Sequence, residues 1–320
     1  MPTKHHPHRG SMQFWPRARC RKHCAKVKSW VDSKENSALG FIGYKVGMTH
    51  VWLKEANANS PRANMNVSTP VTVIECPPVK VYSIRLYKQD EDGSKIISEI
   101  FSKKVDKELA RKTKIAKKSG EEKEDFDRVM LTIYTQPKLT GMGKKKPDLI
   151  EVGVGGKDNK EKLEFAKGLL DKEVKLSDVL KEGELVDVHG VTKGKGFCGT
   201  IKKFGVKRLQ HKSEKKIRGI GTLGAWTTKK VQYTVAQPGR YGYHLRTEYN
   251  KQIVKIGDKV EEINPKGGFL RFGFLKNDYV LIRGSVPGAT KRPITLIKAI
   301  RPKGLIPKIE LTYTSLESKQ

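Results

Sequence analysis

The pattern of apolar and polar positions predicts short β-strands near both ends of the chain. Residues 38–53, ALGFIGYKVGMTHVWL, favour a glycine-punctuated hairpin or pair of strands, and residues 69–78, TPVTVIECPP, favour a strand that two prolines end. After residue 250, QIVKIG, EEINP, DYVLIRGSVPG and RPITLIKAI predict further short strands with Gly and Pro between them. Such strands indicate a β-barrel, which the segments before residue 80 and after residue 250 close together.

Residues 80–178 have a mixed pattern that predicts a compact α+β insertion. Strand-like runs occur in VKVYSIRLYKQ, DRVMLTIYTQP and DLIEVGVGG, and DEDG predicts a turn after the first of them. KEKLEFAKGLL has the apolar spacing of a helix, and LSDVLKEGELVDVHGV predicts one helical turn followed by a strand. SEIFSKKVDKELARKTKIAKK also has helical spacing, at Phe101, Val105, Leu109 and Ile115.

The central stretch, residues 189–255, has neither pattern. It holds sixteen Lys or Arg against two acids, Glu214 and Glu248, and Trp226 lies between Gly224 and a Thr-Thr-Lys-Lys run. So few aliphatic residues cannot bury enough surface to offset the entropy lost when the chain becomes ordered in water. We expect a polyanion to order this stretch, and RNA is the favoured candidate.

The N-terminal residues 1–38 predict a second basic segment, an arm. Residues 1–30 carry eight Lys or Arg and no acid, and Phe14, Trp15 and Trp30 lie among them. Cationic side chains can contact phosphates while aromatic rings stack on exposed bases. The alternative is a disordered tail, which the two tryptophans disfavour.

The overall charge agrees with a nucleic-acid partner. The 320 residues include 65 Lys and Arg against 34 Asp and Glu, a formal charge of +31, which is the electrostatic footprint of a nucleic-acid-binding protein. A soluble basic protein without such a partner is the alternative. The excess is uneven, because residues 101–185 carry twenty-one basic and seventeen acidic residues and predict an ordinary solvated surface.

The sequence does not predict secretion or membrane insertion. Four cysteines are too few for a disulfide framework. No apolar run approaches the roughly twenty residues of a membrane span, and the first residues lack a signal-peptide core. We therefore expect an intracellular, reducing compartment.

Gly194, Gly196 and Gly199 match the G-x-G-x-x-G pattern of a dinucleotide site. Such a site needs a helix that opens at the third glycine and an acid about twenty residues later. Here Gly205 breaks the following segment, KSEKKIRGIG occupies the region of the acid, and the kinase motifs H-R-D and D-F-G do not occur in the chain. We expect no cofactor, and we expect these glycines to bring the backbone close to phosphates.

The cysteines and histidines predict neither a metal site nor a catalytic site. Cys20 and Cys24 are spaced C-x-x-x-C in a His-rich arm, but no second matching pair follows. Cys198 has no sequence support as a nucleophile, and no carboxylate pair or Ser/His/Asp grouping stands out. The sequence therefore predicts no enzyme, no catalytic residue and no metal.

Two turns predict RNA contacts. Trp226 has GTLGA before it and TTKK after it, which favours a ring at a loop tip that stacks on RNA over a ring packed in a core. SVPGATKR, residues 285–292, is a Gly/Pro turn whose basic residues suit contact with phosphate.

Five motifs occur in one order over nearly the whole chain: HRGSMQFWPRAR, GFIGYKVGMTHV, VTKGKGFCGTIKKFG, GAWTTKKVQYTVAQPGRYGYHLRTEYNK and GSVPGATKR. Together they resemble the universal large-subunit ribosomal protein L-three family in its archaeal and eukaryotic form. Eukaryotic members usually have His-Pro after the tryptophan, and many have a long basic C-terminal extension. This chain has Thr227 and Thr228 there and ends with LIPKIELTYTSLESKQ. Both differences favour an archaeal source.

The resemblance implies a mainly β fold, with a translation-factor-like β-barrel, an inserted α+β domain and long basic RNA-binding extensions. The expected segments are a basic N-terminal arm (1–38), the first part of the barrel (39–79), the inserted α+β domain (80–178), the second part of the barrel (179–204), an extended basic loop with Trp226 at its tip (205–250) and the last part of the barrel (251–320).

The resemblance also implies a structural protein of the large ribosomal subunit, in the cytoplasm, that binds large-subunit rRNA and nucleates subunit assembly. Gly224, Ala225 and Trp226 are expected to form a loop tip near the peptidyl transferase centre. Neighbouring large-subunit proteins are expected partners, whereas a membrane and a homo-oligomer are not. The alternatives are an RNA-modifying enzyme and an exchangeable ribosome-associated factor.

The predicted rRNA contacts are cationic and aromatic residues of the arm, the central stretch and the 285–292 turn. They are Arg9, Phe14, Trp15, Arg17, Arg19, Arg21, Lys193, Lys195, Lys202, Lys203, Lys207, Arg208, Lys215, Lys216, Arg218, Trp226, Lys229, Lys230, Arg240, Tyr243, His244, Arg246, Lys251, Lys291 and Arg292. We expect the arm and the loop to be disordered in the free protein and to fold on RNA.

Overall fold

Strands form most of the regular structure, which confirms the mainly β prediction. The computed structural model describes residues 10–55, 59–116, 118–123, 125–213, 216–302 and 309–317. The chain divides into two units, which we describe separately. We call residues 22–191 and 246–320 the barrel unit, and residues 1–21 and 192–245 the arm-and-loop unit.

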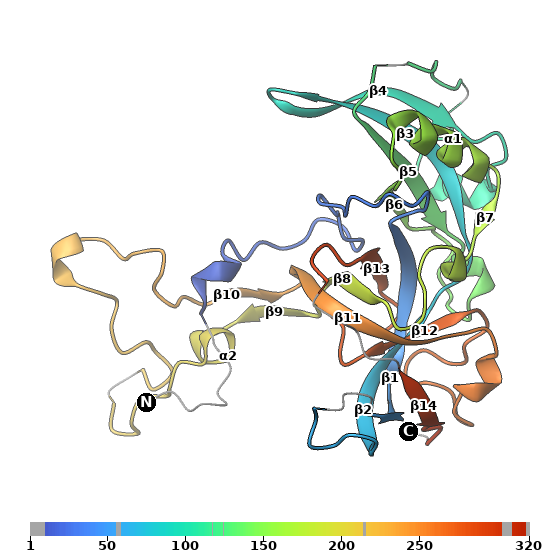
Figure 1. Ribbon diagram of the computed structural model, residues 1–320. Coiled ribbons are helices and arrows are strands. Elements are labelled where there is room, and N and C mark those ends of the chain that lie inside the picture. Colours follow the sequence, from blue (N-terminus) through green and yellow to red (C-terminus); the bar gives the residue numbers. More distant parts are fainter. Residues whose placement is uncertain are drawn as a thin grey trace. The chain divides into compact units, whose positions relative to one another are not determined.

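Seven strands form the largest sheet, which belongs to the barrel unit (Figure 1). Its order is β13-β8-β11-β12-β2-β1-β14, and β13 also pairs with β1, so that six strands form a closed ring and β14 extends the sheet from β1. The strands are β1 (Gly40–Lys54), β2 (Asn66–Glu75), β8 (Leu185–Val191), β11 (Leu245–Gly257), β12 (Tyr279–Arg283), β13 (Pro293–Lys298) and β14 (Glu310–Thr314).

β1 is a single strand of 15 residues, so the hairpin predicted for residues 38–53 is wrong. Its first part pairs with β13 and its last part with β14, while β2 lies beside most of its length. A bulge between Lys45 and Gly47 lets the strand bend between these partners. At Gly43 a Cβ would lie 2.6 Å from Ile74 Cγ2, so glycine is needed for close packing and not for a turn.

A second sheet has the order β4-β3-β5-β6, and β7 pairs with β3. Helix α1 packs against it through the buried Ala166, as its apolar spacing predicted. The elements are β3 (Val79–Asp90), β4 (Gly93–Phe101), β5 (Arg128–Thr135), β6 (Leu149–Gly153), α1 (Asn159–Leu169) and β7 (Glu173–Val174).

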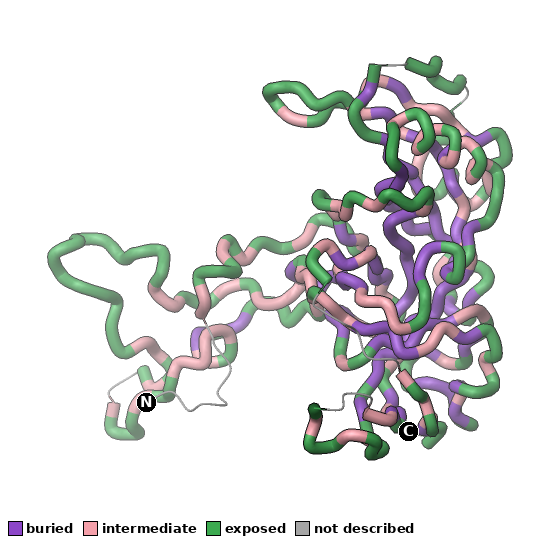
Figure 2. Tube along the Cα trace, viewed as in Figure 1, coloured by how far each residue is buried: buried purple, intermediate pink, exposed green. Residues whose placement is uncertain are grey.

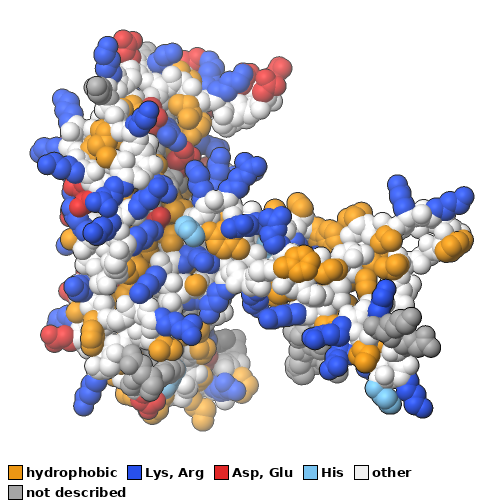
Figure 3. Space-filling model, turned by 180° about the vertical axis from the view of Figure 1, so that it is seen from behind, with side chains coloured by type: hydrophobic (Ala, Val, Ile, Leu, Met, Phe, Trp, Pro, Cys, Tyr) orange, Lys and Arg blue, Asp and Glu red, His pale blue; other side chains and the backbone are white. Residues whose placement is uncertain are grey.

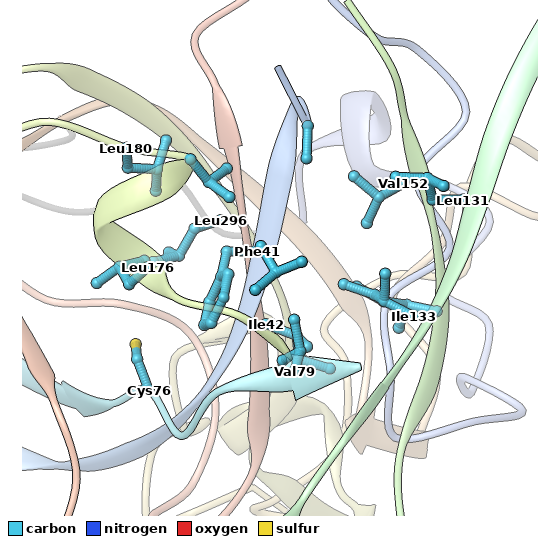
Figure 4. Packing of buried hydrophobic residues seen from close by; sticks show 14 of the residues in the cluster. Phe41, Ile42, Cys76, Val79, Leu131, Ile133, Val152, Leu176, Leu180 and Leu296 are labelled. Carbon is cyan, nitrogen blue, oxygen red and sulfur yellow. The ribbon is translucent and has the colours of Figure 1, made fainter. Parts of the chain in front are cut away.

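One hydrophobic core joins the second sheet to the barrel. In Figure 4, Phe41 and Leu296 of the barrel lie in the same buried cluster as Leu131, Ile133 and Val152 of the second sheet. Each of these side chains is less than a tenth exposed, and burial of one such side chain stabilises the fold by about 1.5–3 kcal/mol. The two sheets therefore stabilise each other.

The long helix predicted around Phe101, Val105 and Leu109 is wrong. Phe101 ends strand β4, and a 3-10 helix, η2 (Lys107–Arg111), follows after a gap. The three side chains pack together with two buried tyrosines in a small cluster of their own. Their spacing therefore comes from tertiary packing, and it resembles helical periodicity although most of the segment is not helical.

The described residues of the barrel unit form three more 3-10 helices, η3 (Pro137–Leu139), η4 (Leu176–Asp178) and η6 (Val260–Glu262). η4 precedes β8, as predicted for that segment. The strand predicted at EEINP is wrong. Part of this segment belongs to η6, and Ile263, which follows η6, is buried in the barrel core.

The arm-and-loop unit has little regular structure. β9 (Gly194–Cys198) and β10 (Gly239–Gly242) form a two-stranded ribbon, and the short helices are η1 (Met12–Phe14), α2 (Thr200–Phe204) and η5 (Trp226–Thr228). Most of this unit is exposed or half-buried (Figure 2). Among its described residues, Cys198, Thr200 and His244 alone are buried. Across the described part of the chain, no helix has the length and hydropathy needed to cross a membrane.

Candidate nucleic-acid interface

The arm-and-loop unit has an unbalanced charge. Its described residues include fifteen Lys or Arg and no Asp or Glu. On the face that Figure 3 presents, acidic side chains lie on the barrel unit and basic ones on both units. Cations without carboxylate neighbours repel one another, so this unit is suited to a polyanion that neutralises them.

The β9–β10 ribbon explains the glycines of the G-x-G-x-x-G match. Gly194 and Gly196 lie within β9, and Gly199 precedes a helix of five residues. Gly194 and Gly196 therefore belong to an exposed ribbon, whereas a dinucleotide site places its glycines in a turn between a strand and a long helix. The ribbon leaves Lys193 and Lys195 exposed, as phosphate contact requires.

Within the arm-and-loop unit, the arm packs against the central stretch, which the sequence did not indicate. The backbone N–H of Cys20 donates to the Tyr243 carbonyl oxygen at 2.9 Å. The Nδ1 atom of His244 lies 2.8 Å from the Ala18 carbonyl oxygen. Because His244 is buried, its ring holds the arm in place and is not available at the surface.

Aromatic rings hold the guanidinium of Arg17. Its Cζ atom lies 5.0 Å from the ring centroid of Trp15 and 5.1 Å from that of Phe204, and Nη2 donates to the Ser11 carbonyl oxygen at 3.0 Å. Burial lowers the pKa of Arg17. Trp15 also meets the Tyr233 ring edge-on, with centroids 5.4 Å apart. These contacts join the arm to the loop by cation–π and aromatic attraction.

Trp226 is presented to solvent by a short, well-bonded turn. Its side chain is 94% exposed, and it begins η5. The Thr228 hydroxyl donates to the Ala225 carbonyl at 3.0 Å, and the Lys229 N–H donates to the Trp226 carbonyl at 3.1 Å. Lys229 adopts the left-handed conformation, with φ of 51°. In this structure Trp226 is not part of a core, and its indole ring is free to stack.

Most other predicted contacts of this unit are exposed. These are Phe14, Arg19, Arg21, Lys202, Lys207, Arg208, Lys216, Arg218, Lys229, Lys230 and Arg240. Lys203 and Tyr243 are half-buried, and burial, followed by the charge of Arg17, lowers the pKa of Lys203. Arg9 and Lys215 lie outside the described residues.

Exposed apolar side chains accompany these cations and were missed in the sequence. Phe197 is 78% exposed and Tyr233 is 75% exposed, and Leu223 and Val231 are also largely exposed. The available signal was the presence of large apolar residues in a stretch without apolar periodicity. Their exposure gives the unit rings and aliphatic surface beside its charges, as single-stranded RNA sites have.

Four predicted contacts belong to the barrel unit. Arg246 and Lys251 are half-buried, and the Lys251 ammonium lies 2.6 Å from the carboxylate of Glu248. Lys291 is exposed and Arg292 is half-buried. The structure thus divides the predicted residues between the two units.

The 285–292 turn is anchored by Lys45, a residue of β1 that the sequence did not single out. Lys45 is buried, and its ammonium donates to the carbonyl oxygens of Val286 and Gly288 at 2.6 and 3.3 Å. Its backbone N–H donates to the Arg292 carbonyl at 3.1 Å, and its own carbonyl accepts from the Lys291 N–H at 2.8 Å. Lys45 therefore sets the position of both basic residues of the turn.

The cysteines do not assemble a site in the described residues. No group of three His, Cys, Asp or Glu side chains there could hold a metal ion. Burial, and then the neighbouring Asp148 carboxylate, raise the pKa of the Cys24 thiol to about 12. A thiol with that pKa stays protonated at neutral pH, so Cys24 is not suited to nucleophilic attack.

Comparison with known proteins agrees with these features. The model of the family described as ribosomal protein L3 matches residues 1–128 and 120–320. The large ribosomal subunit protein uL3 of Methanocaldococcus jannaschii is 44% identical over 98% of this chain and 97% of its own length. The proteins of the same name from Methanobrevibacter smithii and Methanothermobacter thermautotrophicus are 43% and 42% identical over 100% of this chain and 99% of theirs. This chain belongs to the ribosomal protein L3 family.

Proposed function

We propose that this chain is a structural protein of the large ribosomal subunit, in the cytoplasm, and that its arm-and-loop unit binds large-subunit rRNA. The observation that carries the proposal is a unit whose described residues hold fifteen cations and no acid. Relatives named large ribosomal subunit protein uL3 support the choice of subunit. As a ribosomal protein the chain is not an enzyme.

In this proposal phosphate contacts supply most of the affinity, and exposed rings add stacking on unpaired bases. The tip formed by Gly224, Ala225 and Trp226 is proposed to shape the region near the peptidyl transferase centre. Support comes from the 94% exposed indole ring on a turn without acidic neighbours. The closed ring of strands supports a translation-factor-like barrel that carries the extensions. Early rRNA binding that nucleates assembly, and contacts with neighbouring large-subunit proteins, complete the proposal.

Sucrose-gradient fractionation of a native cell lysate tests the proposal. The protein should sediment with large subunits and should stay with them after a wash in roughly half-molar salt. Salt screens exposed charge contacts, but it does not release a protein whose extensions are enclosed by RNA. Loss in the wash would point to an exchangeable factor. Sedimentation as free protein would refute the ribosomal role.

A further inference from the structure

The barrel unit contains a basic pocket that no predicted contact includes. It lies between the end of η2 and the loop at residues 138–145, and it has a volume of about 380 Å³. The cations that line it are Arg111, Lys138, Lys144 and Lys145, with Glu108 as the one acid among the lining residues. A cavity of this size is within the range of ligand-binding pockets. We refer to it as the basic pocket.

The fold concentrates these charges, because the surrounding sequence is nearly balanced. Residues 101–185 carry twenty-one basic and seventeen acidic residues. Acids of the 121–127 segment are used elsewhere, since Glu122 pairs with Lys167 at 2.8 Å and Asp125 pairs with Lys88. The local excess of positive charge at the basic pocket therefore comes from how the chain folds. It cannot be seen in the composition of this segment.

Two of the four cations already have carboxylate partners. Lys138 lies 3.1 Å from Glu108, and Lys144 pairs with the buried Asp148. Among the described residues, Arg111 and Lys145 make no ion pair, and both are exposed. These two side chains can bind an incoming anion without breaking a contact of the fold.

The loop that carries Lys145 is held rigidly at both ends. At one end, the Thr140 hydroxyl donates to the Pro137 carbonyl at 2.7 Å, and Met142 is buried in the barrel core. At the other end, the N–H of Asp148 donates to the Thr135 hydroxyl at 2.9 Å. A preformed loop loses little entropy when it binds a ligand.

The opposite wall is anchored too. Arg111 ends η2, whose Leu109 is fully buried, and the Lys112 N–H donates to the Leu109 carbonyl at 2.8 Å. The backbone of Arg111 is therefore fixed in position, and its guanidinium can bind an anion with the fork geometry that suits two phosphate oxygens.

We propose that the basic pocket is a second RNA contact, which holds a backbone phosphate between Arg111 and Lys145. This inference rests on the proposed function, because rRNA binding by this protein is what would bring a backbone phosphate to the pocket. No aromatic residue lines the pocket, so it offers no platform for a base and recognises phosphate and sugar without sequence preference. The barrel unit then has a phosphate contact in addition to the one predicted at the 285–292 turn.

The test compares two double variants of the full-length protein. The pocket variant is Arg111→Gln with Lys145→Gln, and the control is Arg128→Gln with Lys160→Gln, which removes the same charge from exposed positions on the same unit. Both should keep the melting temperature of the wild type. Affinity for large-subunit rRNA is measured by filter binding over a range of salt concentrations, and hydroxyl-radical footprinting maps the protected backbone.

The pocket variant should reduce the magnitude of the negative slope of log K against log salt by about 0.7–0.9, the contribution of one phosphate. In its footprint, one discrete RNA segment that the wild type protects should no longer be protected. The control should change neither. Equal effects of both variants, or no effect of the pocket variant on an rRNA that the wild type binds, would overturn the pocket and leave the proposed function intact. An unchanged footprint with loss of a neighbouring protein from reconstituted subunits would also overturn it. If the wild type itself does not bind rRNA, the proposed function fails first.

Discussion

At the scale of single residues, burial separates cations that are available to RNA from cations that the fold already uses. Lys195 and Arg208 are exposed, whereas Arg17 lies between two rings. Lys45 is buried and bonded to carbonyl oxygens of a turn. All four have the same formal charge in the sequence. Only their surroundings distinguish a side chain that is exposed to a polyanion from one that holds the fold together.

Replacing Trp226 with alanine should weaken rRNA binding without changing stability. The side chain is 94% exposed, so the free energy of unfolding should change by less than about 0.5 kcal/mol. Loss of one stacked base should cost about 1–3 kcal/mol of binding free energy. Urea denaturation and filter binding measure the two effects.

Leu223→Ala is the matched control, because Leu223 is an exposed apolar residue of the same loop and has no ring. It should reduce affinity less than Trp226→Ala does. Equal losses from the two variants would mean that apolar contact, and not stacking, is the role of Trp226.

The exposure of candidate site residues was most predictable where lysines lie near glycines or near Trp226. Lys193, Lys229 and Lys230 are of this kind, and the structure leaves them exposed. His244 and Arg17 were not distinguishable from them, because their partners are arm and loop residues far away in the chain. Such pairings have no local signal.

At the scale of elements, β1 does more than complete the barrel. It pairs with β13, β2 and β14, and at its bulge it carries Lys45, which holds the 285–292 turn. A strand in the core thus determines where Lys291 and Arg292 lie.

Lys45→Met should weaken the barrel unit and its RNA contact together. Loss of the ammonium leaves two carbonyl oxygens without their donor, which should lower the free energy of unfolding by about 1–3 kcal/mol. It should also reduce rRNA affinity, because the turn that carries Lys291 and Arg292 loses its side-chain anchor at Val286 and Gly288 and keeps only the backbone bonds to residue 45. Urea denaturation and filter binding again separate the two effects.

A double-mutant cycle identifies the cause of the affinity loss. In a Lys291→Gln, Arg292→Gln background, Lys45→Met should cause no further loss of affinity, although it still lowers stability. Additive losses of affinity would show that Lys45 acts on RNA binding by another route.

Elements with strong local patterns were predictable. The β-branched run of β2 and the apolar spacing of α1 were both confirmed. Elements that depend on distant partners were not. Gly43 of β1 serves close packing against β2, and the period at residues 101–109 comes from a cluster with residues of β3 and β5. Local sequence does not distinguish these causes from a turn and a helix.

At the scale of the whole molecule, charge is divided by unit. The ion pairs of the described residues all lie in the barrel unit, whereas the arm-and-loop unit has no carboxylate among its described residues. The two units should therefore respond differently to the removal of a cation.

Removing three exposed cations from the arm-and-loop unit should lower the salt dependence of rRNA binding. Lys195→Gln, Arg208→Gln and Arg218→Gln together should reduce the magnitude of the negative slope of log K against log salt by about 2.1–2.7, at roughly 0.7–0.9 for each of three phosphate contacts. The control is Arg128→Gln, Lys160→Gln and Lys181→Gln, three exposed positions of the barrel unit. Filter binding at several salt concentrations compares them. A similar fall in both variants would mean that net charge matters and placement does not.

The packing of the arm against the loop also has a consequence for the order of synthesis. Trp15 and Arg17 leave the translating ribosome early, but their partners Tyr233 and Phe204 follow about 200 residues later. At roughly 5–20 residues per second, that delay lasts about 10–40 s. During this interval the side chains of Trp15 and Arg17 have, among the described residues, only each other and the nearby Ser11 as partners, and they can contact RNA before they contact the loop.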